Sequence, residues 1–216
     1  MVGRILTRLK ARGVLKEPPR DGISARRRSR PRPYGVRKPR EYQVIEPGDI
    51  VQVDTLDVRP LPGMVLKHFT ARDMVSRWDV LEVHTRATST LAARFLESMR
   101  RRFPFPIKAV QVDGGSEFMA DFETACQKFD IRLFILPPRS PKLNGHVERA
   151  QRTHTEEFYE LYDGELDVST LNRALLKWEQ IYDTFRPHHS LDGLTPLQYL
   201  LQCHPSLVPS NLSHMY

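Results

Sequence analysis

Three short segments in the first half of the chain alternate between apolar and polar residues. They are DIVQVDTLDV at 49–58, MVLKHFTARDM at 64–74 and WDVLEVHT at 78–85, and turn-forming residues such as RPLPG at 59–63 separate them. Such β-type runs between turn signals predict three strands. Three such strands in succession predict an antiparallel meander.

The pattern after residue 85 alternates between helical and strand-like segments. A helix capped by Thr88 or Ser89 is predicted at 88–103, because apolar residues recur on one of its faces, namely Leu91, Ala92, Phe95, Leu96 and Met99. The pattern then predicts a strand at 107–113, a helix at 118–129 and a strand at 131–138. Helical crossovers make the later strands parallel to their neighbours, so the βββαβαβ order predicts an α/β fold with a mixed sheet flanked by helices.

The last third of the chain predicts a helical extension of this core. Helices are expected at 146–162 and 169–185, and the second carries an apolar stripe of expected core residues, namely Leu171, Leu175, Trp178, Ile181 and Tyr182. A short helix should follow, with Thr195 as its cap and Pro196 at its first position.

The N-terminal segment differs from the rest in charge. Residues 1–40 hold 14 Lys and Arg against 2 Asp and Glu, whereas residues 41–216 hold 19 against 24, so the net charges are +12 and −5. A basic arm on a mildly acidic body favours a polyanionic partner such as nucleic acid, because each neutralised phosphate releases counterions. A solvated tail is the alternative.

The spacing of Val2, Ile5, Leu6 and Leu9 before Gly13 predicts a short amphipathic helix, which we interpret as the last helix of a helix-turn-helix that begins upstream of Met1. The composition that follows is typical of a linker, and the folded body should begin near Glu46. The expected parts are a helix at 1–15, a basic Pro- and Arg-rich linker at 16–47, a folded core at 48–162, a helical extension at 163–204 and a tail at 205–216.

No run of about 18 apolar residues and no secretory signal is present, so we expect a cytosolic protein without a membrane partner. Cys126 and Cys203 lie far apart without a nearby partner cysteine, which argues against a disulfide framework and a zinc site. Both are expected to be packing residues.

Three carboxylates occupy the edges of predicted elements. Asp54 lies within the first strand, Asp113 ends a strand just before two glycines, and Glu148 begins a helix after a Pro- and Gly-rich loop. Clustered carboxylates suit hard divalent cations, and two such ions can clamp both oxygens of a phosphoryl transfer. Each also has a structural interpretation: Asp54 as a strand-edge residue, Asp113 as a turn former, and Glu148 as a helical ion-pair partner of Arg152.

Four motifs carry a family resemblance. They are QVDT at 52–55, VQVDGGSEF at 110–118, PPRSPKLNGHVERAQRTHTEEF at 137–158 and YDTFRPHHSLDGLTPLQYL at 182–200. Together, over roughly residues 48–200, they resemble the integrase catalytic core of bacterial insertion-sequence transposases, relatives of retroviral integrases.

The resemblance implies a ribonuclease H-like fold whose D, D, E triad falls on Asp54, Asp113 and Glu148 and binds two Mg²⁺ or Mn²⁺ ions. Between the last two lie 34 residues, one fewer than the commonest family spacing. The implied reaction is cleavage at a DNA end by a metal-activated water, followed by attack of the freed 3′-OH on a target strand. The implied partners are DNA ends, target DNA and further copies of the chain, with no small-molecule substrate.

The residues expected to contact DNA are Arg139, Ser140, Lys142, Asn144, Arg149, Arg152, Arg26, Arg27 and Arg28. Many family members have a basic residue seven positions after the glutamate, where this chain has Thr155; Arg149, Arg152 and His154 are candidate substitutes. The second motif also has DGG where the family often has DNG.

We expect Glu117 to cap the next helix rather than to assist a metal, and we assign no metal to the adjacent His188 and His189. Two alternatives to an active transferase stay open. One is a truncated, non-catalytic DNA-binding remnant, and the other is a nuclease that only hydrolyses.

Overall fold

The computed structural model of the chain describes residues 11–13, 34–137 and 143–208. The chain divides into two compact units, Met1–Pro33 and Tyr34–Tyr216. In the first unit only residues 11–13 are described: Ala11 is helical, and Gly13 lies in a turn with a φ of 70°. This agrees with a helix that ends at Gly13, but the rest of the predicted helix lies outside the described residues.

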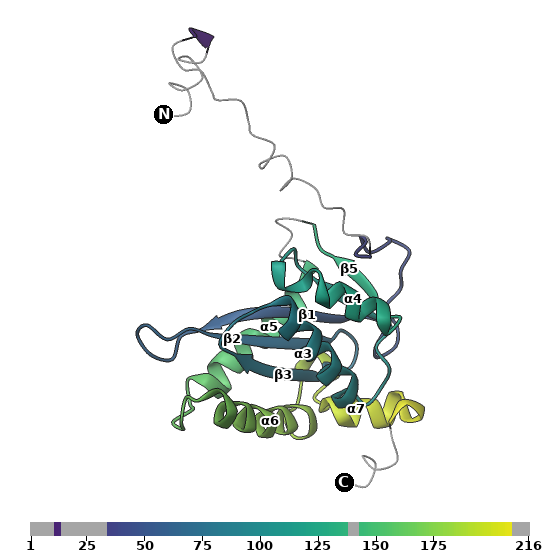
Figure 1. The fold of residues 1–216 in the computed structure, drawn as a ribbon. Helices are drawn as coiled ribbons and strands as arrows, with labels where there is room; N and C mark the ends of the chain where they lie inside the picture. The colour runs from purple at the N-terminus through teal and green to yellow at the C-terminus, as the bar shows by residue number, and fades with distance from the viewer. Residues whose placement is uncertain (1–10, 14–33, 138–142, 209–216) are drawn as a thin grey trace. The chain divides into compact units, whose positions relative to one another are not determined.

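The second unit is built on a five-stranded mixed sheet (Figure 1). The strands are β1 (Val51–Val58), β2 (Leu66–Asp73), β3 (Asp79–His84), β4 (Ala109–Val112) and β5 (Arg132–Ile135), in the spatial order β3-β2-β1-β4-β5. The first three strands pair antiparallel, whereas β4 runs parallel to both β1 and β5. The predicted meander and mixed sheet are therefore confirmed.

One face of the sheet carries the larger apolar core. Helix α3 (Ser89–Arg102), the 3₁₀ turn η1 (Ser116–Phe118), helix α4 (Asp121–Lys128) and helix α7 (Pro196–Cys203) pack on this side. The core includes Val51 and Val53 of β1, and Val110 and Val112 of β4. Because side chains alternate along a strand, the residues between these valines face the opposite side.

The helix caps on this face are the ones predicted from the sequence. The Thr88 hydroxyl accepts a hydrogen bond from the Leu91 amide at 3.2 Å, which makes Thr88 the cap of α3. Thr195 and Gln198 form a reciprocal capping box at the start of α7.

The opposite face is covered by α5 (Gly145–His154), the π-helical turn η3 (Thr155–Tyr159) and α6 (Val168–Thr184). The helix predicted at 146–162 is thus an α-helix that changes into a π-helical turn. Leu171 and Leu175 of α6 lie in a second core with Leu81 and Val83 of β3. Ile181 is 48% exposed, so its predicted core position is wrong. The short turns η4 (His189–Leu191) and η5 (Pro205–Leu207) complete the chain order.

A buried polar network fixes α5 against the sheet. His154 is fully buried, and its Nε2 lies 2.9 Å from Asp79 Oδ2. Trp178 Nε1 donates to His154 Nδ1 at 3.0 Å, so the remaining imidazole proton sits on Nε2 and points at Asp79. Arg72 donates twice to the same carboxylate, each at 2.7 Å. The two partners satisfy the buried charge of Asp79 and tie β2, β3, α5 and α6 together.

The second unit begins earlier in the sequence than the expected start near Glu46. Val36 N donates to Leu133 O at 3.0 Å in an isolated parallel bridge beside β5. The Tyr34 hydroxyl donates to Ile131 O at 2.8 Å. Part of the segment with linker composition therefore extends the sheet beyond β5.

Cys126 is buried in the α4 core, as predicted, whereas Cys203 is exposed and its predicted packing role is wrong. Among the described residues, every helix is too short or too polar to cross a membrane.

Candidate active site

Asp54 lies on the face of β1 that is turned toward α5. Val51 and Val53 enter the core on the α3 side, so Gln52 and Asp54 point the other way. Asp54 is partly buried, and its Oδ1 accepts a hydrogen bond from Thr55 N at 2.8 Å. The strand is central, paired on both sides by β2 and β4, which holds Asp54 rigidly.

Asp113 occupies the matching position on the neighbouring parallel strand. The register pairs Gln52 with Gln111 and Val53 with Val112. The residues that follow these pairs are Asp54 and Asp113, so the two carboxylates leave adjacent strands at the same level. Asp113 is exposed, and its Oδ1 accepts from Gly115 N at 2.8 Å, the turn bond expected of an Asp before two glycines.

Glu117 adds a fourth carboxylate. A Cβ placed on Gly115 would lie 2.7 Å from Glu117 Oε2 and 2.9 Å from Asp113 Oδ1, so these oxygens are within 5.6 Å of each other, the sum of the two distances. The Thr55 hydroxyl donates to Glu117 Oε1 at 2.8 Å. The expected capping role is wrong, because Gly115 caps η1 and Ala120 caps α4.

Glu148 lies in the first turn of α5 and is exposed. Its alternative interpretation as an ion-pair partner of Arg152 is not supported, because Arg152 Nε contacts Glu156 Oε1 at 2.7 Å instead. Within the described part of the chain, Glu148 is in no ion pair.

Asn144 joins the helix of Glu148 to Asp54. Its Nδ2 donates to Asp54 Oδ2 at 3.1 Å, and its carbonyl accepts from Glu148 N at 3.1 Å. Asn144 is the cap residue of α5, but its side chain makes no capping bond to that helix. The amide is therefore used to orient the aspartate.

The electrostatics of the cluster favour a cation. Burial, together with the negative charges of Asp113, Glu148 and Glu117, raises the pKa of Asp54 to about 6. The largest charge effects on Asp54 come from these three acidic groups, which disfavour its ionised form. Oxygen donors of this kind suit a hard divalent ion. In residues 34–137 and 143–208, however, no three His, Cys, Asp or Glu side chains are close enough together to form a metal-binding group.

Two glutamines anchor the start of α5 to the sheet. Gln52 Nε2 and Gln111 Nε2 both donate to the Leu143 carbonyl, at 2.8 and 2.9 Å. Gln52 Oε1 also accepts from Val147 N at 3.1 Å, which satisfies a free amide of the first helical turn. Sequence reasoning missed both residues. The available signal was an amide side chain two positions before each aspartate, on the same strand face.

The expected DNA contacts have different outcomes. Arg139, Ser140, Lys142 and Arg26–Arg28 lie outside the described residues, and Arg149 is exposed on α5. Asn144 is 5% exposed and bonded to Asp54, and Arg152 is in its ion pair with Glu156. His154 cannot replace the missing basic residue, because it is buried in the network with Asp79.

The RPHH segment packs on α6 and η3. Arg186 Nε donates to Glu157 at 2.7 Å, and the His188 ring stands edge-on to Tyr182 with 4.8 Å between centroids. Burial, with Arg72 nearby, lowers the pKa of His188 to about 4. These contacts give the segment a packing role.

Residues 129–196 match the family model described as Integrase core domain. The match includes Glu148, whereas Asp54 and Asp113 lie outside it. No curated protein matches the chain.

The fold is similar to that of a chain in the cryoEM structure of the simian T-cell lymphotropic virus intasome in complex with PP2A regulatory subunit B56 gamma, with a TM-score of 0.65 and 19% identity. The similarity covers 84% of this chain and 62% of that one, so this chain spans less than two thirds of its length. The catalytic core domain of BIV integrase matches with a TM-score of 0.58 and 22% identity, over 73% of this chain and 97% of that one. The mixed sheet with flanking helices is thus the ribonuclease H-like fold of integrase catalytic cores. The family model and the shared fold together support an integrase/transposase catalytic core in this chain.

Proposed function

We propose that the chain is a DDE-type transposase or integrase that cleaves DNA ends and joins them to a target strand, with Asp54, Asp113 and Glu148 as catalytic residues. The observation that carries the proposal is the register of β1 and β4, which sets Asp54 and Asp113 side by side. The charge of Glu148 acts on the same Asp54 carboxylate, so the three residues share one electrostatic site.

The donor set fits divalent metal ions, since these carboxylates have an excess of negative charge and present only oxygen ligands. Asp54, Asp113 and Glu148 would hold two Mg²⁺ or Mn²⁺ ions, and Glu117 stands beside Asp113 as a further oxygen donor. When bound, the ions supply the positive charge that stabilises the transition state of phosphoryl transfer and lower the pKa of the attacking hydroxyl or water.

The protein residues supply placement. Asn144 and the Thr55 amide each hold one oxygen of Asp54, which fixes the direction of the carboxylate. Gln52 and Gln111 hold Leu143, and with it the first turn of α5, so that Glu148 can approach the two aspartates. A carboxylate whose direction is fixed in this way lowers the cost of charge rearrangement during reaction.

Two successive displacements at phosphorus account for the chemistry. In the first, a water oxygen bonds to phosphorus at the DNA end, and the 3′-oxygen leaves as a hydroxyl. In the second, that 3′-hydroxyl bonds to a target phosphorus, and the target's own 3′-oxygen leaves. Each step exchanges one phosphodiester oxygen for another, so no covalent enzyme intermediate is needed.

The proposal also includes the partners. The substrates are two DNA ends and a target duplex, which requires at least two copies of the chain acting together. The expected setting is the bacterial cytosol.

The experiment that tests the function is a DNA-joining assay. Fluorescent duplexes that carry the DNA sequences flanking the gene are incubated with the full chain, a supercoiled plasmid and Mg²⁺ or Mn²⁺. Wild type should join the label to the plasmid, and Asp113→Asn and Glu148→Gln should each lose roughly a hundredfold or more. Asp57→Asn is the matched control, because Asp57 is an exposed β1 carboxylate that contacts Lys67 instead of the site.

Joining by Asp113→Asn at the wild-type rate would remove the proposed reaction from this site. DNA binding by wild type without any joining, under both metals, would instead favour the alternative of a non-catalytic remnant.

A further inference from the structure

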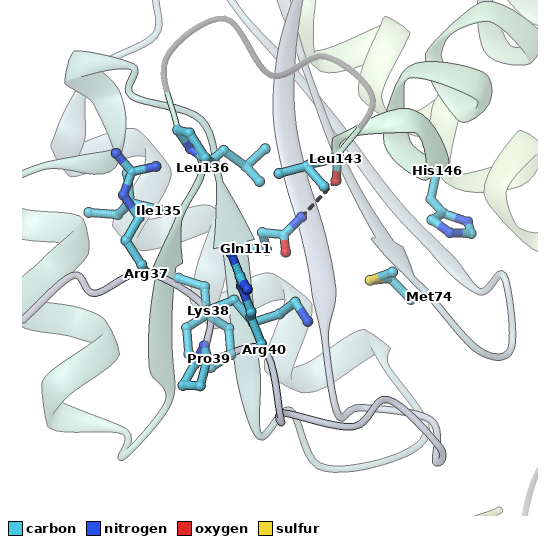
Figure 2. A pocket seen from close by; sticks show the side chains of 12 residues that line it. Arg37, Lys38, Pro39, Arg40, Met74, Gln111, Ile135, Leu136, Leu143 and His146 are labelled. Carbon is cyan, nitrogen blue, oxygen red and sulfur yellow. Dashed lines mark hydrogen bonds between the residues drawn. The ribbon is translucent and has the colours of Figure 1, made fainter.

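A cleft of about 920 Å³ lies between the segment before β1 and the start of α5 (Figure 2). The residues that line it include Arg37, Lys38, Arg40, Gln111 and Leu143. Figure 2 shows Arg37, Lys38 and Arg40 on one side, with Leu143, Met74 and His146 across from them. This volume is within the range of ligand-binding pockets.

The cleft is basic. Arg37, Lys38 and Arg40 are exposed, and no acidic residue is among the described residues that line the cleft. Within the part of the chain that the structure describes, none of these three side chains is in an ion pair. The charge of the cleft therefore comes from the three cations.

These cations are held in place by the fold. The Val36 amide donates to Leu133 O, and the Val36 carbonyl accepts from Ile135 N at 2.9 Å, so the residue before Arg37 is paired with β5. On the other side of the segment, the Tyr42 ring stands edge-on to Phe134 with 4.9 Å between centroids. The basic segment is thus a built wall of the cleft.

Two acidic residues that follow the basic segment share one cation. Lys108 Nζ contacts Glu46 at 2.9 Å and Asp49 at 2.8 Å. Within the described residues, neither carboxylate is in an ion pair with Arg37, Lys38 or Arg40.

The cleft adjoins the carboxylates of the proposed function. Gln111 lines it and lies two residues before Asp113 on β4, and Leu143 lines it next to Asn144, which holds Asp54. A DNA strand that runs from a phosphodiester at the carboxylates toward Gln111 would place its next phosphates in this cleft. Cations at that position suit phosphates, and the apolar floor suits sugars and base edges.

We propose that this cleft binds the sugar–phosphate backbone of a DNA strand beside the active site, with Arg37, Lys38 and Arg40 as the phosphate contacts. The proposal rests on the proposed function, since DNA is its ligand. An acidic peptide is the competing occupant. The position next to the carboxylates favours DNA, because one strand can occupy both the proposed reaction site and this adjoining cleft.

The first test is the salt dependence of DNA binding by the full chain, followed by fluorescence anisotropy of a labelled single strand. The variant Arg37→Gln/Lys38→Gln/Arg40→Gln should bind roughly tenfold more weakly, and the slope of log K against log salt should fall by about 2. The control Arg94→Gln/Arg101→Gln/Lys177→Gln removes the same charge from exposed helical positions and should change both quantities little. Equal effects of the two triple variants would overturn the proposal.

The second test locates the strand, because the basic residues of the N-terminal arm would also contribute to DNA binding in the salt experiment. A photo-crosslinker is attached to Pro39→Cys in a Cys203→Ser chain, since Cys203 is exposed and Cys126 is buried. Crosslinking to DNA should be strong from position 39 and weak from Gln127→Cys, an exposed position on α4. Equal crosslinking from both positions would contradict a cleft-bound strand.

A competition arm separates the two occupants. Unlabelled single-stranded DNA should abolish crosslinking from position 39, whereas an oligoglutamate of equal charge should not. Displacement by oligoglutamate alone would overturn the proposal in favour of an acidic protein partner. If the DNA crosslinks from position 39 and Asp113→Asn still joins DNA, the cleft proposal stands. The proposed reaction at Asp113 is then rejected.

Discussion

Asn144 donates from Nδ2 to Asp54 Oδ2 at 3.1 Å across 90 residues of sequence. The contact joins the central strand of the sheet to the start of the helix that carries Glu148. Because the Asn144 side chain makes no capping bond, its substitution should affect Asp54 more than it affects α5.

A pair of substitutions at Asn144 tests this role. Asn144→Ala should lower DNA joining roughly tenfold, because one oxygen of Asp54 loses its donor. Asn144→Asp should lower the joining rate further, since it places a negative charge where the donor was. Asp is nearly isosteric with Asn and is a good cap residue, so the start of α5 should be kept. The measurement is the joining rate at saturating DNA, with urea unfolding as the control for stability. An Asp variant that joins faster than the Ala variant would contradict the assigned role.

Gln52 and Gln111 share one acceptor, the Leu143 carbonyl, and this predicts non-additive behaviour. Each single Gln→Ala variant leaves the carbonyl with one donor, whereas the double variant leaves it with none. We expect Gln52→Ala to lower the free energy of unfolding more than Gln111→Ala does, because Gln52 also accepts a hydrogen bond from Val147 N. The free energy of unfolding should fall by about 1–3 kcal/mol for Gln52→Ala, and the double variant should exceed the sum of the two. Strict additivity in urea unfolding would argue against a shared acceptor.

Adjacent glycines provide a matched pair at the second aspartate. A Cβ on Gly115 would meet the carboxylates of Asp113 and Glu117, whereas a Cβ on Gly114 would meet nothing within 4 Å. To make room for this Cβ, the two side-chain carboxylates would move rather than the backbone. Gly115→Ala should therefore reduce the joining rate at least severalfold. Its melting temperature should stay near that of wild type, and Gly114→Ala should leave the joining rate unchanged. The same joining rate in both variants would show that the position of these carboxylates does not matter.

Buried neutral histidines predict the pH dependence of stability. Burial, together with His154, lowers the pKa of His68 from its ordinary 6.5 to about 3. The unfolded chain binds the proton more readily than the folded chain. The contribution of neutral His68 to the free energy of unfolding is therefore complete above pH 6.5 and is lost as the pH falls toward 3. Within that pH range, one such histidine changes the free energy of unfolding by about 1.4 kcal/mol per pH unit.

The variant that isolates this group is His68→Asn, which keeps an acceptor near the Tyr159 hydroxyl that now contacts His68 Nδ1 at 2.9 Å. Urea unfolding between pH 4 and 7 should show a shallower slope for the variant than for wild type. Parallel slopes would mean that His68 is not the neutral buried group described above.

The strands and most helices were predictable because their periodicity is local. The strand predicted at 49–58 and the caps at Thr88 and Thr195 depend on neighbouring residues only, and the structure confirms them. The positions of Asp54 within the first strand, and of Asp113 and Glu148 at the ends of predicted elements, were visible for the same reason.

Long-range relationships could not be predicted from the pattern. The shared acceptor of Gln52 and Gln111 depends on the register of β1 against β4, which no single segment encodes. The polar pattern of its helix suggests a surface position for His154. In the structure His154 is buried, where it hydrogen-bonds to the buried Asp79. Likewise, Val36 lies in a sequence with linker composition and is ordered by its bridge to β5.

The central claim is that Asp54, Asp113 and Glu148 together hold divalent ions. The most direct measurement is anomalous scattering from crystals soaked in MnCl₂, with and without a bound DNA end. We predict manganese peaks at roughly 2 Å from carboxylate oxygens of all three residues. Peaks found only elsewhere, or a Glu148 side chain turned away from the manganese in the DNA-bound crystal, would contradict it.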